Sequence, residues 1–423
     1  MSDPIQEIRF SRVAQRMLGA HPELAAEAAR AAPFTRAEME NALAAGRDDS
    51  EASFKRRLRE LRNRVLLRVM ARDLSGRAGL DEVCGTMSDL AELALHAALD
   101  WADERLRAEL GTPRTPAGRA QQLVVVGMGK LGGRELNVSS DIDLVFVYPE
   151  EGETDGRRRL SNQEYFDRLG RRLIGLLAEI TEDGFVFRVD MRLRPYGDSG
   201  ALVTSLDALE AYLVAHGREW ERYAWIKARP LSGNRHDELA AIIRPFVFRK
   251  YLDYATLAAM RRLHAEVRRE VARRDLAEHV KLGPGGIREI EFVAQALQMI
   301  RGGRDPALTV RPTLEVLGEL SRKRLLPENA TRELSEAYVF LRNVEHRLQY
   351  LDDQQTHTLP EAAEDRARVA AMAGFADWRS FAERLQQIRD NVTRHFQDVL
   401  AESEAAGPAL WQDDREAMAR ELE

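Results

Sequence analysis

Ser139-Ser140-Asp141-Ile142-Asp143-Leu144-Val145-Phe146-Val147-Tyr148 is the stretch of the chain that decides its fold. The apolar run after Asp143 predicts a buried β-strand with two aspartates at its start. Because side chains two residues apart on a strand share a face, both carboxylates point the same way. Two carboxylates this close repel each other unless a cation lies between them, and hard oxygen ligands suit Mg²⁺, a common partner of phosphates. The stretch therefore predicts that Asp141 and Asp143 bind Mg²⁺ beside a phosphate group.

A glycine-rich loop comes just before this strand. Gln122–Val126 reads as an earlier buried strand and leads into Gly127-Met128-Gly129-Lys130-Leu131-Gly132-Gly133. Glycines let backbone amides approach an anion closely. Strand, glycine turn, short helical segment and a strand that opens on Asp-x-Asp together resemble the nucleotidyltransferase superfamily that includes DNA polymerase β. A Gly-Ser pair precedes the first metal-binding aspartate in that superfamily, and Gly129-Lys130 takes its place here, with a lysine charge instead of the hydroxyl.

Two other nucleotide-binding motifs can be rejected. Gly127-x-Gly129-x-x-Gly132 also fits the dinucleotide-binding fingerprint, with Glu150 near the place of a ribose-binding acid. The segment from Gly133 to Ser140 is too short, however, for the crossover helix that adjacent parallel strands require. A Walker loop, Gly-x-x-x-x-Gly-Lys-Ser/Thr, does not fit around Lys130. A purely structural Asp-x-Asp strand end stays open as an alternative.

A second alternating segment supplies a third acid. Phe185–Pro195 has the clearest alternation of apolar and polar residues in the chain, and it predicts a strand whose polar face carries Arg188, Asp190, Arg192 and Arg194. That face is either plain solvent surface or, beside an Asp-x-Asp strand, a third carboxylate with phosphate-binding arginines. Three carboxylates around two Mg²⁺ ions can hold both the attacking and the leaving oxygen of an in-line displacement. We therefore expect Asp190 to be a third catalytic metal ligand and Arg192 and Arg194 to bind phosphate.

Trp220, Tyr223, Lys227 and Arg229 are predicted to lie on one helix. The two aromatic residues are expected in the core. Lys227 and Arg229 can reach nucleotide phosphates from such a helix.

The loop Gly283-Pro284-Gly285-Gly286 precedes a predicted helix that begins near Ile287. Free backbone amides at a helix amino terminus form an anion site, to which Gly285 and Gly286 contribute. A tight interdomain turn explains the same loop equally well. Arg288, with the acids that follow it, either closes over a cleft or joins a helical domain to the core by ion pairs. A similar Gly-Pro-Gly-Gly run occurs in the uridylyltransferases of PII proteins.

Long motifs of the chain resemble the bifunctional glutamine synthetase adenylyltransferase/adenylyl-removing enzymes. The four stretches that carry the resemblance are Gly127–Asp143, Asp190–Gly200, Trp220–Arg229 and Lys281–Phe292. That family has two nucleotidyltransferase domains in one chain, and Leu136-Asn137-Val138-Ser139-Ser140 is similar to the first, deadenylylating half. Because a single Asp-x-Asp constellation occurs here, we expect the amino-terminal half alone, without the carboxy-terminal adenylyltransferase half.

The resemblance implies a nucleotidyltransferase, a glutamine synthetase-adenylyl-L-tyrosine phosphorylase. Its reaction would convert adenylylated glutamine synthetase and phosphate into ADP and unmodified synthetase, under control of a PII protein, expected in its uridylylated form. The implied nucleotide-contacting residues are Gly129, Lys130, Ser140, Arg192, Arg194, Lys227, Gly285, Gly286 and Arg288. The acids alone do not set the direction of the reaction, so ATP-dependent protein adenylylation and a non-catalytic PII-sensing module remain alternatives.

Composition limits the class of protein. The chain has 423 residues, of which 44% are hydrophobic and 31% charged, so it can bury a large core in two or three domains. Its net charge of −6 favours a protein or small-molecule substrate over nucleic acid. The single Cys84 excludes an intramolecular disulfide and fits a reducing cytoplasm. No apolar run approaches the ~20 residues of a membrane span, and no signal peptide is recognisable.

The predicted fold class is α+β and mostly helical. Residues 1–112 are expected to be helical, and the arginines between the apolar residues of its long helix are expected on a solvated face. Residues 113–235 should form a polymerase β-like core, a small mixed sheet with helices. Residues 236–404 should form a second helical domain, and the acidic residues 405–423 should begin a linker.

Overall fold

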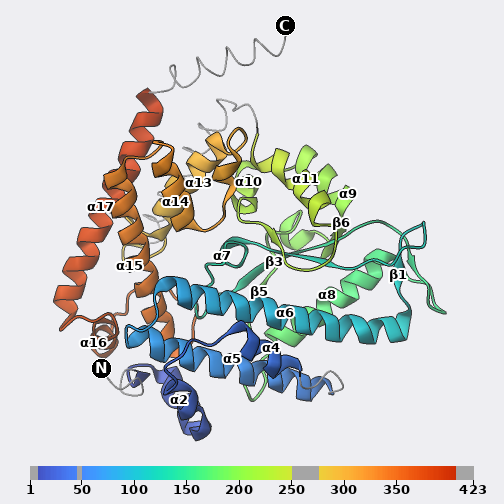
Figure 1. Cartoon of the computed structure of the whole chain (residues 1–423), viewed down its shortest axis with the longest axis horizontal. Helices are drawn as coiled ribbons and strands as arrows, with labels where there is room; N and C mark the ends of the chain where they lie inside the picture. The colour runs from blue at the N-terminus through green and yellow to red at the C-terminus, as the bar shows by residue number, and fades with distance from the viewer. Residues whose placement is uncertain (1–7, 45–49, 250–275, 406–423) are drawn as a thin grey trace. The chain divides into compact units, whose positions relative to one another are not determined.

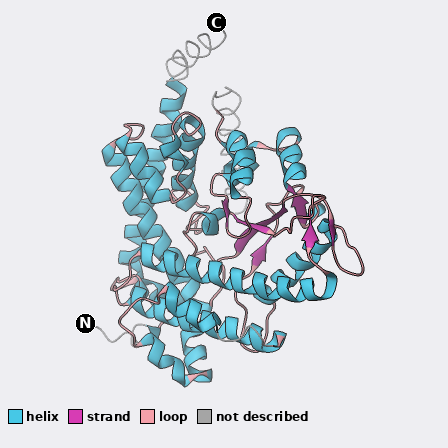
Figure 2. Ribbon diagram, turned by 45° about the vertical axis from the view of Figure 1, so that its right-hand side comes forward, coloured by secondary structure: helices cyan, strands magenta, loops and turns pink. Residues whose placement is uncertain are grey.

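The computed structural model describes residues 8–44, 50–249 and 276–405 (Figure 1). The chain divides into two compact units, which we call unit 1 and unit 2. Unit 1 comprises Met1–Phe246 together with Gln349–Thr356, and unit 2 comprises Val247–Leu348 and His357–Glu423. Figure 2 shows a mostly helical chain with a small sheet, which confirms the predicted α+β class.

The sheet of unit 1 is mixed. Its strands are β2 (Val124–Gly127), β3 (Ile142–Tyr148), β5 (Val189–Asp190), β6 (Val203–Ser205) and β7 (Arg229–Pro230). They run in the order β5-β3-β2-β7, with β6 also pairing with β3. β2 is antiparallel to both β3 and β7, whereas β5 and β6 are parallel to β3. β1 (Pro113–Arg114) and β4 (Glu153–Thr154) form a separate two-stranded sheet.

Helices surround this sheet. Those of unit 1 are α2 (Arg12–Ala20), α3 (Ala25–Ala28), α4 (Arg36–Ala44), α5 (Glu51–Leu74), α6 (Leu80–Leu110), α7 (Gly129–Gly132), α8 (Asn162–Ala178), α9 (Leu206–Ala215), α10 (Glu219–Trp225) and α11 (His236–Val247), and the last ends at the unit boundary. α8 packs closely on the sheet at Gly170, where an added Cβ would lie 2.9 Å from a ring carbon of Phe146. The apolar run of β3 is buried, as the sequence predicts.

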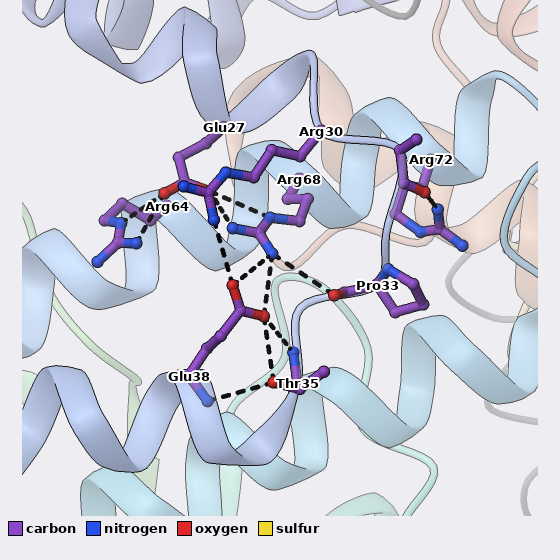
Figure 3. A network of polar contacts seen from close by, with 9 residues as sticks. Glu27, Arg30, Pro33, Thr35, Glu38, Arg64, Arg68 and Arg72 are labelled. Carbon is purple, nitrogen blue, oxygen red and sulfur yellow. Dashed lines mark hydrogen bonds and ion pairs between the residues drawn. The ribbon is translucent and has the colours of Figure 1, made fainter.

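The arginines of α5 correct one expectation. Instead of forming a solvated face, Arg59 and Arg68 have exposed fractions of 0% and 1%. Arg68 donates to Glu27 over 3.1 Å and to Glu38 over 3.1 Å (Figure 3). Its guanidinium lies 4.0 Å from the centre of the Phe34 ring. A guanidinium has five donors, so carboxylates and carbonyls from other elements can compensate its burial. Periodicity within one helix does not reveal those partners.

Unit 2 is helical in its described part, as expected. Its elements are α13 (Ile287–Arg301), the 3₁₀ turn η3 (Pro306–Thr309), α14 (Thr313–Arg322), α15 (Glu328–Asp352), α16 (Ala363–Met372) and α17 (Trp378–Ala405). α13 packs against α17 through the rings of Phe292 and Phe396, whose centroids are 5.6 Å apart. α15 is one continuous helix, and its residues from Gln349 onward belong to unit 1. Across the described residues, we find no helix with the length and apolarity needed to cross a membrane.

Candidate active site

Strand pairing brings the third acid beside the first two. β5 pairs with β3 in parallel, with Ile142 opposite Val189 and Asp143 opposite Asp190. Residues in register on neighbouring strands lie about 4.8 Å apart and present their side chains on the same face. Asp141 immediately precedes β3. The sheet therefore gathers Asp141, Asp143 and Asp190 at one end of β3.

The glycine loop lies directly against these three aspartates, which we call the acid group. The backbone amide of Met128 donates to the carbonyl of Asp143 over 2.9 Å. Gly129 has a φ of +49°, and a Cβ added there would lie 2.9 Å from Oδ2 of Asp143. Both the backbone conformation and the space therefore favour a glycine at position 129.

Arginines neutralise two of the acids. Nε of Arg188 donates to Oδ1 of Asp141 over 2.7 Å. The side chain of Arg192 donates to both oxygens of Asp190, over 3.0 Å and 2.9 Å, and its backbone amide adds a third bond. Burial alone would raise the pKa of Asp190, but the hydrogen bonds and charge of Arg192 outweigh it and hold that pKa below its ordinary value. Asp190 is therefore held as a carboxylate.

The donor chemistry of the acid group fits Mg²⁺, although the side chains are not gathered around one point. Within the described ranges, no three His, Cys, Asp or Glu side chains are arranged to hold a metal ion. Asp141 and Asp190 each face an arginine instead. Carboxylate oxygens from three neighbouring positions are nevertheless the ligands that Mg²⁺ prefers. An ion here would share these carboxylates with Arg188 and Arg192 or replace the guanidinium groups.

The segment expected to be one long strand is mostly irregular loop and turn. β5 contains only Val189 and Asp190, and the chain then turns through Tyr196, which has a φ of +61°. The guanidinium of Arg194 donates to the carbonyls of Met191 over 2.9 Å and Asp198 over 3.2 Å. Arg194 thus braces this turn, whereas Arg192 is exposed over 72% of its side chain. The prediction of an extended strand is wrong, because alternation within a segment does not show how far a neighbouring strand pairs with it.

Lys227 and Arg229 do not share a helix with Trp220, in contrast to the prediction. α10 ends at Trp225, and Arg229 lies on β7. Nζ of Lys227, which is buried, is 2.6 Å from Oε2 of Glu135. Arg229 donates to the carbonyl of Gly132 over 3.0 Å and to Glu92 over 2.6 Å. These cations brace the end of the glycine loop.

The aromatic residues of this segment also differ from the expectation. Trp220 has an exposed fraction of 41%, and Tyr223 is half-buried. Neither is therefore a fully buried core residue. Lys130 on α7 and Ser140 before β3 are half-buried, and their role in nucleotide binding stays a prediction.

The glycine loop of unit 2 is a tight turn whose amides are engaged. The amide of Gly285 donates to Oε2 of Glu289 over 3.1 Å, and that of Arg288 donates to the carbonyl of Lys281 over 3.0 Å. Gly286 and Ile287 donate to other carbonyls of the same segment. The expectation of free amides is therefore wrong. A nucleotide-binding role for Gly285, Gly286 and Arg288 stays a prediction.

A cavity of about 520 Å³ opens beyond the turn that follows Asp190. Tyr196 and Tyr212 line it, with their rings edge to face and their centroids 4.6 Å apart. Tyr148, which also lines it, is far along β3 from Asp143, so about 17 Å of strand separates the two Cα atoms. The cavity is therefore apart from the acid group.

Sequence reasoning gave no role to Arg188, the partner of Asp141. The sequence does place Arg188 on the same predicted strand face as Asp190, because it comes two residues before Asp190. Which carboxylate it would meet depends on the pairing of β5 with β3, which the sequence does not state.

Comparisons with known proteins identify the family of the chain. Residues 7–242 match the family model described as glutamate-ammonia ligase adenylyltransferase, and residues 259–400 match one described as GlnD PII-uridylyltransferase. Relatives that match the chain carry the name bifunctional glutamine synthetase adenylyltransferase/adenylyl-removing enzyme. The one from Chromobacterium violaceum is 54% identical over 412 residues, which cover 96% of this chain and 46% of the relative. The one from Aromatoleum aromaticum is 53% identical over 416 residues, which cover 98% of this chain and 44% of the relative.

The chain thus spans about half the length of the curated relatives it matches. The first family model covers more than half of the chain and includes the glycine loop, β3 and all three acids. The chain belongs to the glutamate-ammonia ligase adenylyltransferase family.

Proposed function

We propose that this chain removes AMP from a tyrosine of adenylylated glutamine synthetase by phosphorolysis, with ADP and unmodified synthetase as products. The observation that carries the proposal is the register of Asp143 with Asp190, beside a glycine loop that lies against Asp143. That arrangement suits displacement at a phosphorus atom. The names of the relatives support an adenylylated glutamine synthetase as the substrate.

Each residue has a defined task in the proposed reaction. Asp141, Asp143 and Asp190 would hold Mg²⁺, which when bound neutralises charge on the phosphate oxygens. Gly129 lets the loop backbone approach the same region without a clash with Asp143. An oxygen of inorganic phosphate attacks the adenylyl phosphorus, the bond from phosphorus to the tyrosine oxygen breaks, and the tyrosine takes up a proton. Arg192, exposed beside Asp190, can bind the incoming phosphate with its guanidinium.

Adenylylation of the synthetase from ATP is the competing reaction, because displacement at phosphorus is reversible. A positive group beside the acids favours phosphorolysis, since a phosphate dianion as nucleophile needs such a partner. Arg192 provides that group. The likeness of Leu136–Ser140 to the deadenylylating half of the family supports the same direction.

We also propose that unit 2 responds to a PII protein, expected in its uridylylated form. The match of residues 259–400 to the PII-uridylyltransferase family model supports this partner. The single Cys84, buried in α6, supports a cytoplasmic location for the reaction.

The test is to incubate the chain with adenylylated glutamine synthetase, Mg²⁺ and phosphate, and to identify the released nucleotide. We expect ADP, formed only when phosphate is present. Free AMP without phosphate would make the chain a hydrolase, and efficient adenylylation from ATP would reverse the proposed direction. The variant Asp143→Asn serves as the control, because loss of a preorganised charge should lower turnover on the order of 10²-fold or more.

A further inference from the structure

A buried glutamine contacts the segment that carries the first acid. Gln349, near the end of α15, has an exposed fraction of 1%, and its Oε1 accepts the backbone N–H of Ser139 over 3.0 Å. Its Nε2 has no hydrogen-bond partner among the described residues. Buried amides are rarely left half-satisfied, so this side chain is held at a cost. Ser139 lies two residues before Asp141.

Ser139 in turn positions the arginine that holds Asp141. Nη2 of Arg188 donates to the carbonyl of Ser139 over 2.9 Å and to its hydroxyl oxygen over 3.1 Å. Nε of the same guanidinium donates to Asp141 over 2.7 Å. Because a guanidinium is planar and rigid, fixing one edge of it fixes the other. Gln349 is thereby connected to the Asp141 carboxylate.

A second series of contacts, which we call the second route, links the end of α15 to Arg188. Asp353, just after α15, accepts bonds of 2.8 Å from Nη2 of Arg62 at both carboxylate oxygens. The guanidinium of Arg62 lies 4.7 Å from the centre of the Phe185 ring, and that of Arg188 lies 5.1 Å from it. Arg62 is buried, so its position depends on these partners. Both routes therefore converge on Arg188.

We propose that Gln349 and Asp353 are positioning residues for Asp141, acting through Arg188. The proposal rests on the proposed function, because it assigns Asp141 to the metal-binding acids. A guanidinium that is only partly buried is not oriented by packing alone, and these two contacts supply the missing orientation. Gln349 lies in α15 and Asp353 directly follows that helix, which starts at Glu328 in unit 2 and ends in unit 1. The orientation of the first acid therefore depends on the helix that joins the two units.

The neighbouring aspartate offers a matched control. Asp352 pairs with Arg12 and Arg16 on α2, and among the described residues neither arginine contacts Arg188. Asp353→Asn and Asp352→Asn each remove one paired charge from the same helix end. Only the first change breaks a route to Asp141.

The experiment compares Asp353→Asn, Gln349→Met and Asp352→Asn with the wild-type chain. Mg²⁺ affinity is measured by titration calorimetry without substrate, together with the unfolding temperature and the kcat for adenylylated glutamine synthetase. Loss of a group that orients a metal ligand weakens metal binding or activity by roughly 10-fold or more. We expect that loss in Asp353→Asn and Gln349→Met. Asp352→Asn should keep wild-type Mg²⁺ affinity although it also lowers the unfolding temperature.

Any of three results would overturn the proposal. The first is wild-type Mg²⁺ affinity in Asp353→Asn and Gln349→Met, whatever their stability, which would make both residues purely structural. The second is an equal loss of affinity in Asp352→Asn, and the third is no Mg²⁺ binding by the wild-type chain. Because the calorimetry contains no substrate, failure of the wild-type chain to act on adenylylated synthetase would refute the proposed function and leave the positioning result standing.

Discussion

At the scale of single residues, the site depends on positions where only one residue type fits. Gly129 combines a positive φ with close contact to Asp143. Asp143 and Asp190 lie in register on neighbouring strands, as the proposed shared metal requires. Arg192 and Arg194 lie two residues apart, yet one is exposed beside an acid and the other is bound to carbonyls of its own turn. Identical side chains therefore have different tasks here.

Replacing Gly129 by alanine should damage activity more than stability. The new Cβ would lie 2.9 Å from Oδ2 of Asp143 and would sit on a backbone with a φ of +49°. We expect destabilisation of about 1–3 kcal/mol from the strained backbone. Turnover should fall on the order of 10²-fold because the acid is displaced. Gly175→Ala on α8, where an added Cβ meets nothing within 4 Å, is the control and should retain full turnover.

Alanine at Arg192 and alanine at Arg194 should affect different properties of the protein. Arg192→Ala removes the exposed guanidinium beside Asp190, so we expect a higher phosphate requirement. Arg194→Ala leaves carbonyls of the turn unpaired, so we expect a loss of about 1–3 kcal/mol in the free energy of unfolding. Phosphate titration and urea unfolding distinguish the two. Unchanged phosphate dependence in Arg192→Ala would contradict its proposed role.

At the scale of elements, α5 shows how long-range partners override a local pattern. Its Arg68 faces inward because α3 and α4 bring Glu27 and Glu38 to it. The segment Phe185–Pro195 shows the converse. Apolar and polar residues alternate over its eleven residues, but only Val189 and Asp190 pair as the strand β5. Tertiary contacts decide which parts of a periodic segment become regular structure.

Arg68→Met should strongly destabilise unit 1. The change leaves Glu27 buried without its main cation, and breaking a buried ion pair on one side costs about 3–5 kcal/mol. Urea unfolding monitored by circular dichroism measures the loss. Arg56→Met, whose side chain is 55% exposed on the same helix, should leave the free energy of unfolding unchanged. Equal effects of the two variants would mean that the network adds no stability.

The same network predicts a loss of stability in acid. Burial would raise the pKa of Glu27, but hydrogen bonds and charge from Arg68 and Arg64 hold it below its ordinary value. A carboxyl with a lowered folded-state pKa stabilises the fold above its unfolded pKa, about 4.3, and loses that contribution as pH falls through the folded value. Unfolding curves between neutral and acidic pH should show the decline. It should be smaller in Arg68→Met.

At the scale of the whole molecule, unit 1 is not continuous in sequence. Gln349–Thr356 returns to it after the helices of unit 2. That short segment supplies Tyr350, whose hydroxyl donates to Asp73, and Asp353, which accepts from Arg62. Unit 1 therefore includes a segment that follows Phe246 by about a hundred residues in the sequence.

A chain cut after residue 246 should be much less stable than the full chain. The cut removes Gln349–Thr356 and leaves Arg62 buried without Asp353, which alone costs about 3–5 kcal/mol. Thermal unfolding of the two chains tests this, with a chain cut after residue 405 as the control that keeps the segment. An equally stable shorter chain would show that the returning segment adds nothing to unit 1.

The sequence alone determined the parts that depend on neighbouring residues. The strand that opens with Asp141 and Asp143, the glycine loop at Gly129 and the helical character of the second unit follow from periodicity and from the backbone freedom of glycine. Local patterns set these features because the interacting groups are close in the chain.

Only the tertiary structure decided where distant charges meet. The pairing of Arg188 with Asp141, of Lys227 with Glu135 and of Arg62 with Asp353 joins residues from separate elements. The burial of each arginine or lysine depends on a partner that arrives from elsewhere in the fold, because an unpaired charge is too costly to bury. No pattern within one segment encodes the identity of that partner, so these contacts emerge only when the whole chain is folded.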